Sequence, residues 1–80
     1  MLESKIQSNL IKRLESKGWY VLKLIQTNKN GIPDLLCIKD GWKIMFIEVK
    51  SKNGKVSELQ KYRHKELKER NIHTYIFYEP

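Results

Sequence analysis

Two carboxylates and one ammonium group draw attention first, because each lies in or beside an apolar segment that should be a buried strand. Asp34 follows Pro33 at the start of the run PDLLCI. Glu48 and Lys50 flank Val49 at the end of the run KIMFIEVK. Ionised side chains are costly to remove from water unless opposite charges or hydrogen bonds compensate them. Such a set at strand ends suits a divalent cation with a water molecule beside it, which is the chemistry of a metal-dependent nuclease.

The chemistry of these groups suggests a role for each. Asp34 and Glu48 offer hard oxygen ligands suited to Mg²⁺ or Mn²⁺, and the main-chain carbonyl of Val49 is a candidate for a further ligand. The cation would lower the pKa of a bound water and offset the charge that develops on phosphorus. Lys50 would orient that water or stabilise the transition state. The plainer alternative for Lys50 is a strand-end lysine that pairs with Glu48.

Local patterns predict six elements that could hold these residues in place. Apolar residues recur at three- and four-residue steps as far as Leu14, which predicts a first helix that ends at Gly18. Segments rich in branched and aromatic residues predict strands, and a second helix is expected to end at Asn71. The expected elements after the first helix are strands over 19–25, 34–39 and 42–50, a helix over 57–70 and a strand over 72–78.

This order of elements, α-β-β-β-α-β, predicts the fold class. The second helix, with Leu59, Tyr62 and Leu67 expected on its inward side, can act as a right-handed crossover that sets the fourth strand parallel to the third. The result is an α/β domain with a mixed central sheet flanked by helices. The chain of 80 residues makes a single domain over 1–80.

The connection between the second and third strands decides whether the acidic residues can meet. A two-residue turn at 40–41 would put Asp34 on the opposite sheet face from Glu48, because side chains alternate along a strand. A three-residue loop over 39–41 would instead set Asp34 opposite Phe46 and on the same face as Glu48, with the glycine in a left-handed conformation. The site therefore requires an odd-length loop or a bulge at this position.

Composition limits the class of protein. Sixteen Lys and Arg residues against nine Asp and Glu give a formal charge of +7, which suits a polyanionic partner such as nucleic acid. The single Cys37 excludes an intramolecular disulfide and a cysteine-based zinc site, and its apolar surroundings indicate a buried structural thiol. No segment approaches the roughly 18 apolar residues of a membrane span, and the first residues are not a signal peptide. We expect a cytoplasmic, reduced protein, and a chain this small commonly forms a homodimer.

The segments GIPDLL and FIEVK, followed by a glycine-containing loop and SELQ, resemble the VRR-NUC family of the PD-(D/E)XK nuclease superfamily. Members of this family are small nucleases that occur alone in phage and bacteria. The resemblance implies a restriction-endonuclease-like αβββαβ fold and hydrolysis of DNA phosphodiester bonds with Mg²⁺ or Mn²⁺. It also implies a homodimer that acts on branched DNA, similar to Holliday-junction resolvases.

The resemblance also assigns site residues. It matches five positions of this chain to the family's site: Glu3, Asp34, Glu48, Lys50 and Gln60. Glu3 would reach the metal directly or through water, although an acidic residue in a first helical turn is favoured by the helix dipole whatever its function. Gln60 also fits a capping box with Ser57, so helix capping is its alternative role.

Basic and histidine side chains complete the candidates. Lys23, Lys29, Lys52 and Lys55 are expected near the site, where they could contact DNA phosphates, and their alternative is a solvated surface. His64 and His73 could serve as a general base on chemistry alone. Neither histidine is expected near Glu48, because His64 is placed on a polar helix face and His73 in the last strand.

Two other functions compete with a metal-dependent DNA endonuclease. The first is a non-catalytic nucleic-acid-binding module that retains the nuclease fold, for which a broken acidic set would be diagnostic. Here Asp34, Glu48 and Lys50 are all present. The second is a small basic interaction protein in which the charged triplet is incidental, and such a protein would bind neither Mg²⁺ nor Mn²⁺.

Overall fold

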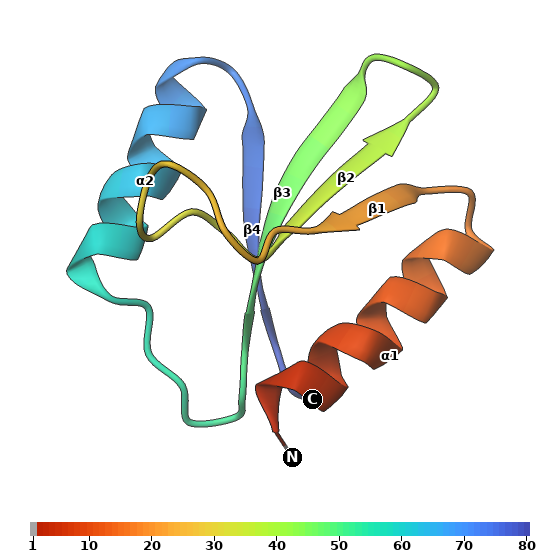
Figure 1. Ribbon diagram of the computed structural model, residues 1–80, viewed down its shortest axis with the longest axis horizontal. Coiled ribbons are helices and arrows are strands. Elements are labelled where there is room, and N and C mark those ends of the chain that lie inside the picture. Colours follow the sequence, from red (N-terminus) through yellow and green to blue (C-terminus); the bar gives the residue numbers. More distant parts are fainter. Residues whose placement is uncertain (1) are drawn as a thin grey trace.

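The computed structural model describes residues 2–80 and contains the six elements that the sequence predicts, in the same order (Figure 1). Each strand is trimmed by one to three residues relative to the sequence-based expectation. Neither described helix has the length and apolar character needed to cross a bilayer. The elements are α1 (Glu3–Ser16), β1 (Tyr20–Lys23), β2 (Leu35–Lys39), β3 (Lys43–Lys50), α2 (Glu58–Glu69) and β4 (His73–Tyr78).

The four strands form one mixed sheet in the order β1-β2-β3-β4. β1, β2 and β3 are antiparallel neighbours, whereas β4 is parallel to β3 and is reached through α2, which confirms the expected crossover. The two helices lie on opposite sides of the sheet (Figure 1). The fold is therefore the α/β arrangement predicted above, with a mixed sheet flanked by helices.

The hairpin between β2 and β3 has the odd loop length that the site requires. Lys39 pairs with Lys43, so three residues, 40–42, connect the strands. The loop lies one residue later than expected because Asp40, with φ 55°, adopts the left-handed conformation together with Gly41, with φ 74°. Aspartate tolerates this conformation better than most residues. As a consequence, continuation of the register sets Asp34 opposite Glu48 instead of Phe46.

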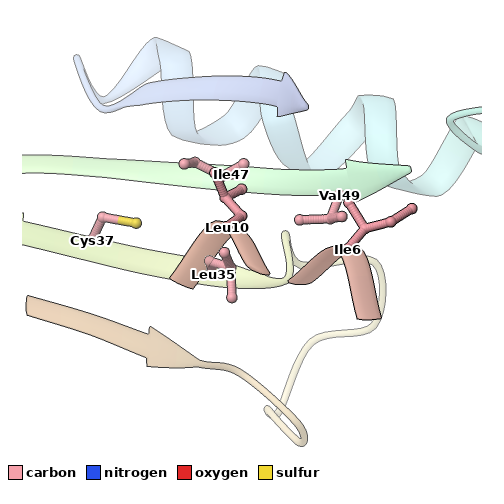
Figure 2. Close-up of a cluster of buried hydrophobic side chains, with 6 residues drawn as sticks. All are labelled: Ile6, Leu10, Leu35, Cys37, Ile47 and Val49. Atoms are coloured by element: carbon pink, nitrogen blue, oxygen red, sulfur yellow. The ribbon is translucent and has the colours of Figure 1, made fainter. Parts of the chain in front are cut away.

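The hydrophobic core lies between α1 and one face of the sheet. Figure 2 shows Ile6 and Leu10 of α1 beside apolar side chains of β2 and β3. Cys37 belongs to this core, and burial raises the pKa of its thiol to about 11, so it is an inert structural residue. Because α1 takes the apolar face of β2 and β3, the alternate residues of these strands face α2.

Both helices end at a residue in the left-handed conformation. Gly18 has φ 92°, and the amide of Trp19 bonds back to the carbonyl of Leu14 at 3.1 Å. Asn71, with φ 63°, ends α2 in the same way. These are Schellman-type ends, in which glycine or asparagine is favoured at the left-handed position. The sequence signals for the two helix ends are confirmed.

The orientation of α2 differs from the prediction. Leu59 and Tyr62 were expected on its inward side, but they are 42% and 56% exposed. Leu59 lies against Gly31 in the loop between β1 and β2, and Arg63 Nε donates a hydrogen bond to the carbonyl of Asn30 at 2.8 Å in the same loop. Figure 1 shows this loop reaching across to α2. The buried residue of α2 is His64.

Candidate active site

Strand alternation brings the acidic residues to the sheet face that α2 covers. Val49 is fully buried against α1, so its neighbours Glu48 and Lys50 project from the other face. Leu35 pairs with Ile47, and therefore Asp34, one residue before β2, lies in line with Glu48. Geometry thus unites the three residues that the sequence singled out.

Asp34 is held by the backbone of β3. Its Oδ2 accepts a hydrogen bond from the amide of Val49 at 2.8 Å. The register would place Pro33 opposite Val49, and proline has no N–H with which to continue the ladder. The carboxylate of Asp34 takes up the free amide at this point, which fixes the direction of its side chain. The N–H and C=O of one strand residue point to the same edge, so the carbonyl of Val49 also points toward Asp34.

Glu48 is the centre of the site and is only 2% exposed. Its Oε2 accepts a hydrogen bond from Gln60 Nε2 at 3.1 Å and lies 3.9 Å from Lys50 Nζ. Burial, together with the hydrogen bond and negative charge of Asp34, raises the pKa of Glu48 to about 8, although Lys50 acts in the opposite direction. Glu48 therefore keeps its proton near neutral pH, unless a cation replaces it.

Gln60 caps α2 and also contacts Glu48. Its Oε1 accepts from the amide of Ser57 at 2.9 Å, while Ser57 Oγ accepts from the amide of Gln60 at 3.1 Å. This reciprocal pair is the capping box that begins α2. The amide nitrogen of the same side chain holds Glu48, so the first turn of α2 is tied to the site.

Glu3 reaches the end of β3 from the first turn of α1. Its Oε2 accepts a hydrogen bond from the amide of Ser51 at 3.2 Å, across 48 positions of sequence. Its negative charge also contributes to the raised pKa of Glu48. Gly54 leaves room for this arrangement, because a Cβ at that position would lie 3.2 Å from Glu3 Oε2. Glu3 thus borders the site while its carboxylate is engaged with the backbone.

Comparison with known proteins agrees with this fold. The sequence profile of the VRR-NUC domain matches residues 2–78. This chain belongs to the VRR-NUC family. A solved structure described as a VRR-NUC domain superimposes with a TM-score of 0.85 and 31% sequence identity, over 96% of this chain and 84% of that chain. No curated protein sequence matches. The VRR-NUC domain is a nuclease-type domain, so the fold and the nuclease class are those expected from the sequence.

The donor set of this VRR-NUC chain fits a hard divalent cation. Asp34 and Glu48 supply two neighbouring carboxylates, and Glu48 Oε1 has no hydrogen-bond partner within the described residues. Among residues 2–80, no group of three or more His, Cys, Asp and Glu side chains is arranged to hold a metal. The remaining ligands would then be the Val49 carbonyl, water and substrate oxygens. Mg²⁺ characteristically binds in this way, through one or two carboxylates plus waters and phosphates.

His64 is a site residue that sequence reasoning placed elsewhere. It is 7% exposed, and its Nε2 lies 3.8 Å from Glu48 Oε1. Burial lowers the pKa of the imidazole, and the charges of Lys68 and Lys50 lower it further, so the ring is neutral at pH 7. The available signal was helical spacing: His64 follows Gln60 by four residues, and residues four apart share a helix face.

The lysines divide into two groups. Lys52 and Lys55 lie in the exposed segment between β3 and α2, which begins at the site, and Lys29 lies in the exposed loop between β1 and β2. Lys23 does not face the site, because it pairs with Leu35 and directly paired residues share a face. Lys23 therefore lies on the α1 side, away from Glu48, and the expectation that it borders the site is wrong. His73 is exposed at the start of β4.

Proposed function

We propose that this VRR-NUC chain is a DNA endonuclease that hydrolyses phosphodiester bonds with Mg²⁺ or Mn²⁺. The observation that carries the proposal is the buried carboxyl group of Glu48, which lies beside Asp34. Burial and the neighbouring Asp34 raise the pKa of Glu48 to about 8. A fold does not keep a buried carboxyl group beside a second carboxyl group for stability, because repulsion between the two groups and the desolvation of Glu48 oppose folding. Perturbed groups of this kind are characteristic of functional sites.

The side chains divide the work by charge and position. Asp34 and Glu48, with the carbonyl of Val49, would hold the cation, which when bound supplies an acidic water and offsets charge on the phosphate. Lys50, whose Nζ lies 3.9 Å from Glu48 Oε2, would orient the attacking water or stabilise negative charge in the transition state. Gln60 holds Oε2 of Glu48 through a hydrogen bond. Glu3 positions the end of β3 through the amide of Ser51 and would reach the cation through water.

Charge and surface chemistry support DNA as the substrate. The net charge of +7 favours a polyanion, and Lys29, Lys52 and Lys55 are exposed on loops that begin or end beside the site. These lysines would contact backbone phosphates and so contribute affinity without sequence preference.

A homodimer that cuts branched DNA, including Holliday junctions, is the assembly we propose. The sheet face that carries Glu48 continues beyond α2 over β1 and the hairpin, where Tyr20, Leu22 and Ile44 remain exposed. Exposed apolar side chains on a small domain support self-association. Two copies would present two sites, as cleavage of two strands at a junction requires.

The test is cleavage of labelled four-way, flap, duplex and single-stranded DNA in Mg²⁺, in Mn²⁺ and in EDTA. We expect cleavage with either metal, none in EDTA, and preference for a branched substrate. Glu48→Ala and Lys50→Ala should each lower the rate by at least about 10³-fold, whereas Glu58→Ala, at a carboxylate 93% exposed, should cleave as wild type does. Wild-type activity in either site variant would refute the mechanism. DNA binding without any cleavage would instead favour a non-catalytic nucleic-acid-binding module.

A further inference from the structure

The carboxylate of Glu48 lies between two side chains of α2 that are one helical turn apart. Gln60 donates to Oε2 at 3.1 Å, and His64 Nε2 stands 3.8 Å from Oε1. Both Oε1 and Nε2 are buried, and neither has a hydrogen-bond partner within residues 2–80. One oxygen of the carboxylate is therefore fixed by α2, while the other faces a polar atom that it does not yet contact.

This unpaired pair of atoms needs an explanation, because buried polar atoms without hydrogen-bond partners are rare and destabilise the folded state. The separation of 3.8 Å exceeds the limit of about 3.2 Å for an N–H···O bond, so a movement of less than an ångström would satisfy both atoms. Hydrogen bonds at catalytic sites are often long in the free protein and shorten when the site is loaded. The position of His64 matches that pattern.

We propose that His64 is a positioning residue for Glu48: its Nε2–H donates to Oε1 when the site holds a divalent cation, and with Gln60 it fixes both oxygens of the carboxylate. The inference rests on the proposed metal-dependent function. His64 is only 7% exposed, and we expect its effect to pass through Glu48 and not through a contact with DNA. Groups that orient a metal-binding side chain in this way commonly change metal affinity by 10- to 100-fold.

A purely structural role for His64 predicts a different response from a positioning role. Leucine at position 64 would fill a similar volume and leave Oε1 unpaired. Glutamine would place an amide N–H about as far along the side chain as Nε2, whereas asparagine would be too short to reach. Packing alone would therefore tolerate leucine at least as well as glutamine, and positioning requires the reverse order.

The experiment is Mn²⁺ binding by isothermal titration calorimetry without DNA, together with steady-state cleavage, on His64→Leu, His64→Asn and His64→Gln. His73→Gln is the matched control, since His73 is exposed on β4. We expect Mn²⁺ affinity to fall about ten-fold or more in the leucine and asparagine variants and to stay within about three-fold of wild type in the glutamine variant. KM for DNA should be unchanged while kcat falls at limiting Mn²⁺.

Each outcome is decisive. If His64→Leu does not fold, His64→Asn, which keeps a polar side chain at this position, supplies the comparison. If a folded leucine or asparagine variant binds Mn²⁺ as tightly as the wild-type protein does, the positioning role of His64 is refuted. The nuclease function is not affected by that result as long as the wild-type protein cleaves DNA. An equal loss in the glutamine variant also refutes the positioning role. Absence of both Mn²⁺ binding and cleavage in the wild-type protein would refute the nuclease function itself and this inference with it.

Discussion

The free energy of unfolding of this protein should fall as the pH rises from about 4.5 to about 8. Replacing Glu48 by glutamine should remove most of that fall. In the folded protein, burial and the neighbouring Asp34 raise the pKa of Glu48 to about 8, against 4.5 for an unperturbed glutamate. Between these values the folded state keeps a proton that the unfolded state has released. The free energy of unfolding therefore falls as pH increases: the contribution is complete below pH 4.5 and is lost as pH passes through 8.

The size of this effect follows from the two pKa values. They differ by roughly 3.5, and one pKa unit corresponds to about 1.36 kcal/mol, which sets an upper bound of about 5 kcal/mol. Relaxation and water penetration around a buried charge reduce such penalties, so we expect a loss of about 2–4 kcal/mol in the wild-type protein. Glutamine at position 48 is a neutral isostere of the protonated acid and should avoid that loss. At pH 8.5 and above the variant should be the more stable protein.

The assay is urea denaturation in EDTA at half-unit steps from pH 4.5 to pH 8.5, on wild type, Glu48→Gln and the control Glu58→Gln. The exposed Glu58 should leave the wild-type curve unchanged. The pKa of His64 is lowered by burial, so its contribution is lost as pH falls below 6.5, but wild type and variant share it and their difference isolates Glu48. Parallel curves for wild type and Glu48→Gln would refute the account of this site. Excess Mg²⁺ should restore stability at pH 8.5 only in the wild type.

Three further predictions concern the surroundings of the site. Gln60→Ala removes one half of a capping box and the hydrogen bond to Glu48, so we expect urea denaturation to show a loss of about 1–2 kcal/mol and cleavage to fall at least about ten-fold. An unchanged rate would show that the Glu48 contact has no functional role. Asp34→Asn keeps an acceptor for the β3 amide. Burial still raises the Glu48 pKa in this variant, but the contribution from the charge of Asp34 is removed, so stability should fall less steeply with pH while cleavage is lost. A pH profile as steep as that of wild type would contradict the coupling. Gly31→Ala should lower the free energy of unfolding by about 2–4 kcal/mol, because the new Cβ would lie 2.7 Å from Cγ of Leu59 and because residue 31 has a positive φ. Gly41→Ala has the positive φ but no contact within 4 Å and should cost about 1–2 kcal/mol; equal losses would remove the steric argument.

The elements of this fold follow from local sequence signals, which is why they could be predicted. Gly18 and Asn71 end the helices because a left-handed residue is needed there, and branched and aromatic runs give the strands. The requirement that Asp34 and Glu48 share a face also follows from strand alternation, and the odd-length loop was confirmed. The predicted pairing between the second and third strands was wrong by one residue in the position of the loop. The loop is displaced because Asp40 adopts the left-handed conformation.

The inward face of α2 could not be found from hydrophobic spacing. Apolar periodicity predicts which side of a helix is buried only where that side meets an apolar surface, and this helix meets the charged site. Leu59 turns instead toward the loop at Gly31, where the absence of a side chain makes room for it. The hydrogen bond that the amide of Ser51 donates to Glu3 could not be predicted either, because no local sequence pattern links residues 48 positions apart.

Gln60 belongs to the capping box of α2 and also contacts Glu48. Together these two contacts restrict the choice of amino acid at position 60 more tightly than either contact would alone. The side chain there must accept a hydrogen bond from Ser57 with one atom and donate one to Glu48 with the other. Ionised glutamate can only accept, lysine can only donate, and asparagine is one methylene shorter. Among the common side chains glutamine alone has this length and polarity, so saturation mutagenesis selecting for nuclease activity should recover essentially one residue at this position even though most of its neighbours on α2 vary freely.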